Sequence, residues 1–235
     1  ELGSYYGERA RALNILNEIA LDNDDDESRR VQRALETANR FLGTDTAIVS
    51  DITDQTYTIR WHHERRPSTL HDGLSLPLDH TYCSMALEQG EVLAISHTAR
   101  SRYRNHPCYQ AFGLESYLAA PIWLDDRIVG TLNFSSEQPH RPAFTESEKM
   151  FVTLLARWVA TILERHQSEQ MKSRFISTVS NELQAPLDSI SRSLDQILGG
   201  TINGLPDKTY NLLKSARRDT NQIRKLVNEL LDKES

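Results

Sequence analysis

The hydrophobic positions of the chain follow one pattern before about residue 145 and another after it. In the earlier part, apolar residues spaced three or four apart predict helices over residues 8–21, 28–42 and 81–89. Between these helices, short apolar runs bounded by turn residues predict antiparallel strands. The predicted strands cover residues 46–52, 55–61, 92–96, 117–124 and 127–135. Helices mixed with antiparallel strands indicate an α+β domain.

The later part of the chain reads as helical throughout. Thr145 and Glu148 have the spacing of a capping box, in which a hydroxyl and a carboxylate each satisfy a backbone N–H at the start of a helix. The apolar face of this helix is formed by Phe175, Ile176, Val179, Leu183, Leu187, Ile190, Leu194 and Ile197. We expect the helix to run unbroken to Ala185 and to bend at Pro186. An amphipathic helix of this length requires a partner helix.

A second long helix follows a turn marked by Gly199, Gly200 and Gly204. Pro206 is expected in its first turn, where proline is favoured. Its apolar stripe comprises Leu212, Leu213, Ala216, Ile223, Leu226, Val227, Leu230 and Leu231. Two antiparallel amphipathic helices cannot bury both stripes alone, whereas two such hairpins can bury them in a four-helix bundle of coiled-coil type. We therefore expect an all-α hairpin that forms a homodimer.

The charge, the apolar runs and the cysteine content of the chain argue against several classes of protein. The 235 residues carry 27 Lys+Arg and 33 Asp+Glu, a formal net charge of −6, which argues against nucleic-acid binding because phosphates require a basic surface. No apolar run approaches the roughly 20 residues that a membrane-spanning helix requires. Cys83 and Cys108 cannot form a disulfide framework, so we expect a cytoplasmic protein. The change of pattern divides the chain into residues 1–165 and 166–235.

Five short stretches of the first part share features with a known family. They are Leu42–Ala47, Tyr82–Leu87, Gly90–Glu91, Ala119–Ile122 and Gly130–Phe134. Together they resemble the GAF domain, a sensory module with a central antiparallel sheet between helices. These residues determine the fold rather than the ligand, so the resemblance implies a signal-sensing domain of unknown ligand.

A ligand pocket is predicted between the sheet and the loops within residues 62–112. Its candidate lining residues are Tyr82, Cys83, Tyr117 and Trp123, although packing in the core explains the same aromatic residues equally well.

A covalently bound tetrapyrrole is the alternative use of Cys83. Photoreceptor relatives usually have a histidine after such a cysteine, whereas Ser84 follows Cys83 here. A small hydrophobic residue buried beside Met85 and Leu87 is the preferred interpretation.

Histidines suggest a second alternative, a metal site. Six of them fall between His62 and His106, yet no pair has the CxxC or HxxxH spacing that is typical of metal ligands. His62 and His63 would point to opposite faces of a strand. We expect exposed loop histidines and no metal.

The two long helices carry a second set of motifs. These are Lys172–Leu187, with the sequence KSRFISTVSNELQAPL, and Leu226–Asp232, with the sequence LVNELLD. Both resemble the HisKA-type dimerisation and phosphoacceptor hairpin of sensor histidine kinases. The resemblance places Asn181 where the family has the histidine that takes the phosphoryl group.

Neighbouring positions depart from the family as well. Glu182, which in the family assists proton removal from the histidine, is present, but Gln184 replaces an expected Arg, and Ala185 replaces a Thr that serves phosphatase chemistry. Asn181 lies about 200° around the helix from Val179 and therefore faces solvent. Its amide lacks the nucleophilic nitrogen of an imidazole, so the site is interpreted as degenerate.

These features predict the signal-sensing and dimerisation region of a two-component sensor histidine kinase, not catalytic by itself. We expect no cofactor, since ATP and Mg²⁺ would serve a separate kinase domain and the 235 residues contain no glycine-rich phosphate loop. Basic residues on the last helix form either a solvated face or a docking site for a response-regulator receiver domain. The rival interpretations are an active phosphorelay kinase whose acceptor histidine was replaced, and a chromophore-binding GAF photoreceptor.

Overall fold

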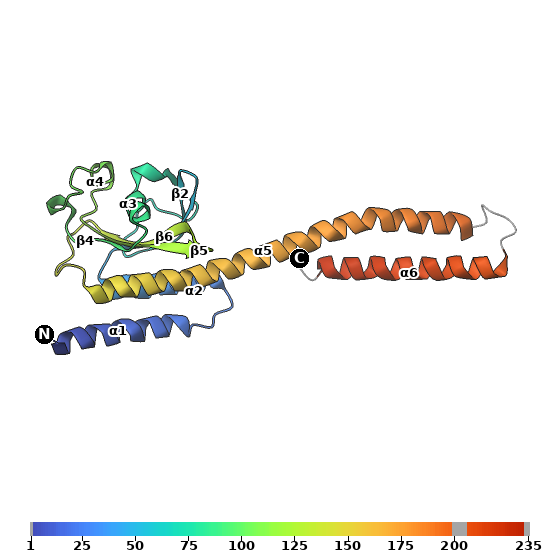
Figure 1. Ribbon diagram of the computed structural model, residues 1–235, viewed down its shortest axis with the longest axis horizontal. Coiled ribbons are helices and arrows are strands. Elements are labelled where there is room, and N and C mark those ends of the chain that lie inside the picture. Colours follow the sequence, from blue (N-terminus) through green and yellow to red (C-terminus); the bar gives the residue numbers. More distant parts are fainter. Residues whose placement is uncertain (1, 199–205, 233–235) are drawn as a thin grey trace. The chain divides into compact units, whose positions relative to one another are not determined.

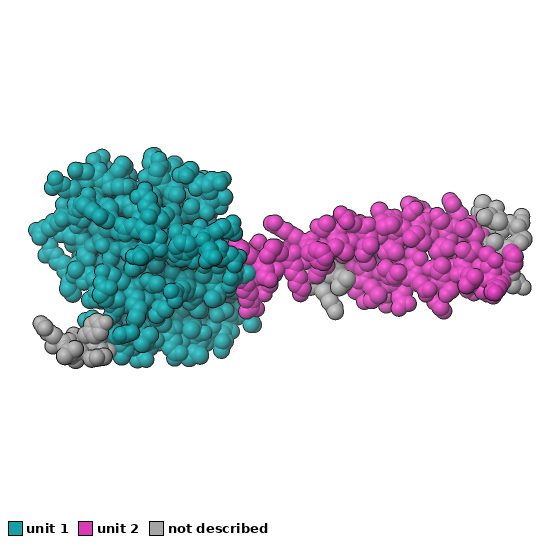
Figure 2. Space-filling view, viewed as in Figure 1, with its two compact units in different colours: residues 1–164 teal, residues 165–235 magenta. Residues whose placement is uncertain are grey.

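The computed structural model of the chain describes residues 2–198 and 206–232. The chain divides into two compact units, Glu1–Glu164 and Arg165–Ser235, which Figure 2 shows in different colours. One helix, α5 (Glu146–Gln196), begins in the first unit and continues in the second. None of the helices in the described part of the chain combines the length and the hydropathy that a membrane crossing requires.

A six-stranded antiparallel sheet forms the centre of the first unit, with the strand order β3-β2-β1-β6-β5-β4. Its strands are β1 (Thr46–Thr53), β2 (Thr56–Glu64), β3 (Ser75–Pro77), β4 (Leu93–Ile95), β5 (Ser116–Leu124) and β6 (Arg127–Ser136). β6 lies between β1 and β5, so that Ser135 is opposite both Thr46 and Tyr117. The pairing therefore joins residues that are far apart in the sequence.

Helices cover both faces of this sheet (Figure 1). On one face lie α2 (Glu27–Leu42) and the first part of α5, with α1 (Leu2–Ala20) against α2. On the other lie α3 (Cys83–Gln89), α4 (Pro107–Phe112) and two 3₁₀ turns, Leu78–His80 and Thr98–Arg100. The predicted α+β class and the antiparallel sheet flanked by helices are confirmed.

Each face of the sheet contributes to its own hydrophobic core, because successive side chains of a strand point to opposite faces. In β5, Leu118, Ala120 and Ile122 join the core under α2 and α5. Tyr117 and Ala119 join the core under α3. The candidate ligand cavity opens in the second of these cores.

Gly130 in β6 is required by close packing against β1. A Cβ atom at this position would lie 1.8 Å from the carbonyl oxygen of Ser50, which belongs to the backbone and cannot turn aside. We expect Gly130→Ala to lower the free energy of unfolding by about 3 kcal/mol. Urea denaturation followed by circular dichroism measures the loss.

Gly7→Ala provides the matched control for this prediction. Gly7 lies in α1, and a Cβ atom added there would meet no other atom within 4 Å. The helix propensity of alanine should leave stability unchanged or raise it by about 0.5–1 kcal/mol. Equal effects of the two substitutions would contradict the close β1–β6 contact.

The second unit is a helical hairpin formed by the later part of α5 and by α6 (Asp207–Asp232). Polar contacts between the helices run in opposite directions along the two, as an antiparallel pair requires. Gln184 Nε2 donates to Asn228 Oδ1 at 3.3 Å, Asp188 pairs with Arg224 at 3.7 Å, and Asp195 pairs with Arg217 at 3.4 Å. The seam between the helices buries Ser180, Leu187, Ser191 and Leu194 of α5 and Thr220 and Val227 of α6. The predicted hairpin is confirmed.

The two prolines of the hairpin compare differently with the sequence prediction. Pro186 lies inside α5, as predicted, and the helix continues through it as far as Gln196. Pro206 precedes α6 instead of lying inside its first turn, and its carbonyl accepts a hydrogen bond from the Tyr210 N–H at 3.0 Å. The predicted turn at Gly199, Gly200 and Gly204 lies outside the described residues.

Candidate functional site

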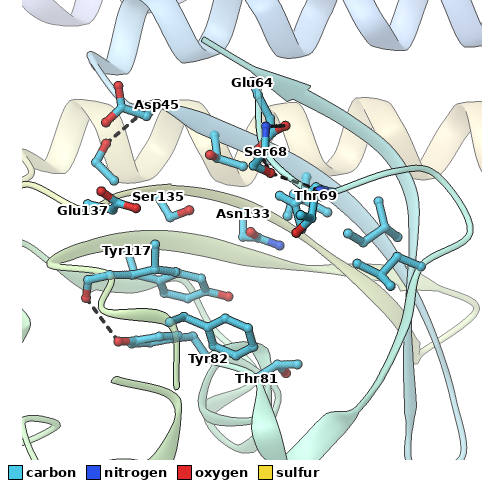
Figure 3. A pocket seen from close by; sticks show the side chains of 18 of the residues that line it. Asp45, Glu64, Ser68, Thr69, Thr81, Tyr82, Tyr117, Asn133, Ser135 and Glu137 are labelled. Carbon is cyan, nitrogen blue, oxygen red and sulfur yellow. Dashed lines mark hydrogen bonds between the residues drawn. The ribbon is translucent and has the colours of Figure 1, made fainter. Parts of the chain in front are cut away.

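A cavity of about 600 Å³ opens between the sheet and the segments that cover its α3 face (Figure 3). Its aliphatic wall is formed by Ile48, Ile59, Leu70, Leu74, Leu76 and Leu114. Four aromatic side chains, those of Tyr57, Tyr82, Phe112 and Tyr117, also line it. Its size and mostly apolar lining are those of small-molecule sites in proteins.

The polar lining of the cavity comes from the end of the sheet and from the segment after β2. Asp45, Ser135 and Glu137 lie where β1 starts and β6 ends. After β2, the Glu64 carboxylate accepts hydrogen bonds from the Ser68 N–H at 3.2 Å and from the Ser68 hydroxyl at 2.6 Å. This contact fixes the backbone of the segment that forms one side of the cavity.

Cys83 lies in a buried hydrogen-bonded cluster beside the cavity. Its sulfur is 3.0 Å from the hydroxyl oxygen of Tyr117, and it accepts a hydrogen bond from the Thr131 hydroxyl at 3.1 Å. The Asn133 amide approaches the same sulfur at 3.6 Å. Burial raises the pKa of the Cys83 thiol and raises the pKa of Tyr117 well above its ordinary value. The cluster therefore holds neutral thiol and phenol groups.

Three of the four residues predicted to line the pocket do so. Tyr82, Cys83 and Tyr117 lie on the cavity wall. Trp123 does not, because it lies six residues further along β5, is 47% exposed, and approaches Gly90 at the end of α3. Cys83 was predicted as a small hydrophobic residue, and the structure adds its hydrogen bonds to that interpretation.

Sequence reasoning missed the polar end of the cavity and the segment after β2. Asp45 and Ser135 are 90 residues apart and meet only through the pairing of β1 with β6, where the Asp45 N–H donates to the Ser135 carbonyl at 3.0 Å. The strand pattern alone could have indicated Asn133 and Ser135, which alternate with the buried Leu132 and Phe134.

Both cysteines are expected to resist alkylation in the folded protein. Cys83 is 3% exposed and Cys108 is fully buried, and desolvation raises the pKa of Cys108 to about 11. Because the thiolate is the reactive form, iodoacetamide at pH 8 should modify both at least about 100-fold more slowly than in urea-unfolded protein. Peptide mass spectrometry over time measures each rate. Native and unfolded rates within tenfold of each other would contradict this burial.

No metal centre is evident in the described residues. Among residues 2–198 and 206–232, no three His, Cys, Asp or Glu side chains converge in a group that could hold an ion. His62, one of the histidines considered for such a site, lies 2.6 Å from an oxygen of Asp72 through its Nδ1.

The candidate phosphoacceptor position lies on the exposed side of α5. Asn181, Glu182 and Ala185 are exposed, whereas Ser180 is buried in the seam with α6. Gln184 is half-buried and bonded to Asn228. Asn181 therefore occupies a position that a separate protein domain could reach.

The hairpin also has an apolar face that its own two helices leave exposed, here called the open face. Its residues and their exposed fractions are Phe175 69%, Val179 37%, Leu183 41%, Ile190 48%, Leu212 64%, Ile223 47% and Leu226 53%. At about 100° per residue, the exposed apolar residues of each helix lie about a quarter turn around the helix axis from the residues buried in the seam. Viewed from the N-terminus of each helix, this offset has the same direction in α5 and α6. Since the helices are antiparallel, both stripes lie on one face of the hairpin.

The sequence matches the models of two protein families. The chain belongs to the GAF domain family, whose family model matches residues 26–163. Residues 171–235 match the His Kinase A (phospho-acceptor) domain. Both family resemblances stated from the sequence are confirmed.

Solved structures share the fold of the first unit. The GAF domain of a phosphoenolpyruvate-protein phosphotransferase from Coxiella burnetii is 17% identical, with a TM-score of 0.57 over 69% of this chain and 98% of that one. The free methionine-R-sulfoxide reductase of Neisseria meningitidis, in complex with its substrate, is 14% identical, with a TM-score of 0.52 over 67% and 89%. A phycocyanobilin-bound GAF domain from a cyanobacterial phytochrome is 17% identical, with a TM-score of 0.51 over 70% and 96%. At these identities the likeness concerns the fold alone. A search of curated proteins found no match.

Proposed function

We propose that this chain is the sensing and dimerisation region of a cytoplasmic two-component sensor histidine kinase, with a degenerate phosphoacceptor position. The order of the two matched families, GAF and then His Kinase A, supports the general assignment. Residues 1–165 are taken as the sensory domain and residues 166–235 as the dimerisation hairpin. The observation that carries the proposal is the open face, on a hairpin of a family that typically dimerises.

A second copy of the hairpin is the proposed cover of the open face. Burying one Leu or Ile side chain contributes roughly 1.5–3 kcal/mol, and the open face offers several such residues from each copy. Two hairpins packed through these faces form a four-helix bundle, in which each apolar stripe is removed from water.

The proposed loss of the phosphoacceptor rests on the chemistry of Asn181. Phosphoryl transfer needs a nucleophile, and a carboxamide nitrogen shares its lone pair with the carbonyl. Glu182 then has no imidazole from which to accept a proton. Gln184 and Ala185 also differ from the family, which favours degeneracy of the whole site over replacement of a single histidine.

The proposed partner besides a second copy is a response-regulator receiver domain, docked on the basic residues of α6. Arg217 and Arg224 already pair with acids of α5. Lys208 and Lys214 are exposed, and neither forms an ion pair with any of the described residues. They are the basic groups that an acidic partner would meet.

A chromophore-binding photoreceptor is not favoured as the alternative. The likeness to phytochrome domains concerns the fold alone, and the Cys83 sulfur is buried and hydrogen-bonded to Tyr117 and Thr131.

Phosphorylation in trans tests the proposed function. The chain is incubated with radiolabelled ATP, Mg²⁺ and the ATP-binding domain of an active histidine kinase, with a histidine-containing hairpin as the positive control. We expect label on the control and no acid-labile label on this chain. Acid-labile label within residues 171–198 would overturn the proposed degeneracy.

A further inference from the structure

The cavity of the GAF domain has walls suited to a flat, apolar ligand. The rings of Tyr82 and Tyr117 are stacked, with centroids 5.1 Å apart and planes at 28°, and both line the cavity (Figure 3). Tyr57 and Phe112 add two further rings to the lining. Aromatic walls bind planar rings through offset stacking and attract cations through the negative face of the ring.

The charged groups of the lining are predominantly acidic. Asp45, Glu64 and Glu137 contribute three carboxylates, and Arg66 contributes the single guanidinium of the described lining. Glu64 is already engaged by Ser68, whereas the carboxylates of Asp45 and Glu137 have no ionic partner among the described residues. A ligand that carries a carboxylate or a phosphate would meet this excess of negative charge, and a cation would be attracted by it.

Two buried polar side chains point into the cavity near this acidic end. Ser135 is 4% exposed and lines the cavity, and no hydrogen bond joins its hydroxyl to another of the described residues. Asn133 is 3% exposed and directs its amide nitrogen to Tyr57 and Thr131, which leaves its carbonyl oxygen as an acceptor. The Ser135 hydroxyl oxygen and the Asn133 carbonyl oxygen can therefore accept hydrogen bonds from a ligand in the cavity that supplies N–H donors.

We propose that this cavity binds a planar aromatic cation, with its rings against the Tyr82–Tyr117 pair and its positive nitrogen toward Asp45 and Glu137. The inference rests on the proposed function, in which the GAF domain is the sensory part, and it specifies the chemical class of the ligand. Ser135 and Asn133 accept hydrogen bonds from the nitrogen in this arrangement. The carboxylates supply selectivity for charge, and the aromatic and aliphatic walls supply most of the affinity.

Three probes of the same ring shape test the charge selectivity. They are 9-aminoacridine, which is a cation at pH 7.5, acridine, which is neutral, and acridine-9-carboxylate, which is an anion. Fluorescence titration of the full chain gives the three dissociation constants. We expect the cation to bind at least about tenfold more tightly than the anion, with the neutral ring between them.

Substitutions in and outside the cavity test whether the three probes bind there. The double substitution Asp45→Asn with Glu137→Gln keeps the shape of both side chains and should reduce the preference for the cation to less than about threefold, with the affinity for acridine unchanged. Glu91→Gln removes an exposed carboxylate that does not line the cavity and should change nothing. Leu74→Trp fills the cavity and should abolish binding of all three probes, with folding checked by circular dichroism.

Each outcome decides the proposal. Cation preference that disappears in the double variant supports it. Equal binding of the three probes, tighter binding of the anion, or no binding overturns the ligand class. The proposed function is tested separately, by whether the chain forms a dimer. If the chain dimerises but the probes show no preference for the cation, only the ligand class is wrong.

Discussion

Asn181→His should convert a hairpin that takes no phosphoryl group into one that does. The side chain at 181 is exposed on α5, so the substitution introduces an imidazole nucleophile without disturbing the seam. Glu182 follows it and can orient the ring and accept its proton. With a kinase domain, ATP and Mg²⁺ supplied in trans, acid-labile label should rise at least about tenfold above that of the unsubstituted chain. Recovery should be partial, because Gln184 and Ala185 also differ from the family.

Ser189→His is the matched control for this gain. Ser189 is an exposed residue of the same helix, outside the phosphoacceptor motif, and a histidine there should take no label. Phosphatase activity should remain absent from the Asn181→His protein, since Ala185 has no group to position a water. A folded Asn181→His dimer without label would contradict the view that this single position limits the chemistry.

Leu183→Asp should convert the proposed dimer to a monomer. Leu183 is 41% exposed on the open face, and two copies of the substitution would place two carboxylates in the apolar centre of the bundle. The loss of leucine burial alone, about 3 kcal/mol for two copies, weakens dimerisation by roughly 100-fold. Sedimentation equilibrium at several concentrations measures the change in dissociation constant.

Ala185→Asp introduces the same charge on the other side of the helix. Two residues correspond to about 200° of rotation, so this exposed position points away from the open face. It should leave the dissociation constant within about threefold of the unsubstituted value. Similar weakening by both substitutions would show that the open face is not the contact between copies.

Local signals in the sequence predicted most elements of the fold. Gly43 and Gly90 end their helices in left-handed conformations, with φ of 67° and 65°. Asp125 and Asp126 form the tight turn between β5 and β6 with positive φ at both positions. Thr145 and Glu148 exchange capping-box hydrogen bonds, at 2.7 Å to the Thr145 N–H and 3.2 Å to the Thr145 hydroxyl. Each of these features depends on neighbours within a few residues.

The cavity was predicted less completely because contacts between distant segments form it. Trp123 was expected to line the same pocket as Tyr117, but six residues along β5 correspond to about 20 Å. A register shift between Ile122 and Trp123 also interrupts the alternation of side chains along β5 just before the tryptophan. Asp45 and Glu137 reach the cavity through the β1–β6 pairing, which no local pattern identifies.

The mass of the unsubstituted chain in solution is the most direct test of the proposed dimer. Static light scattering at micromolar concentration, coupled to size-exclusion chromatography, should give twice the 26.8 kDa of one chain. A mass of two chains is the result expected if a second copy covers the open face. A mass of 26.8 kDa across the same concentrations would contradict the proposal that the hairpin joins two copies of the chain.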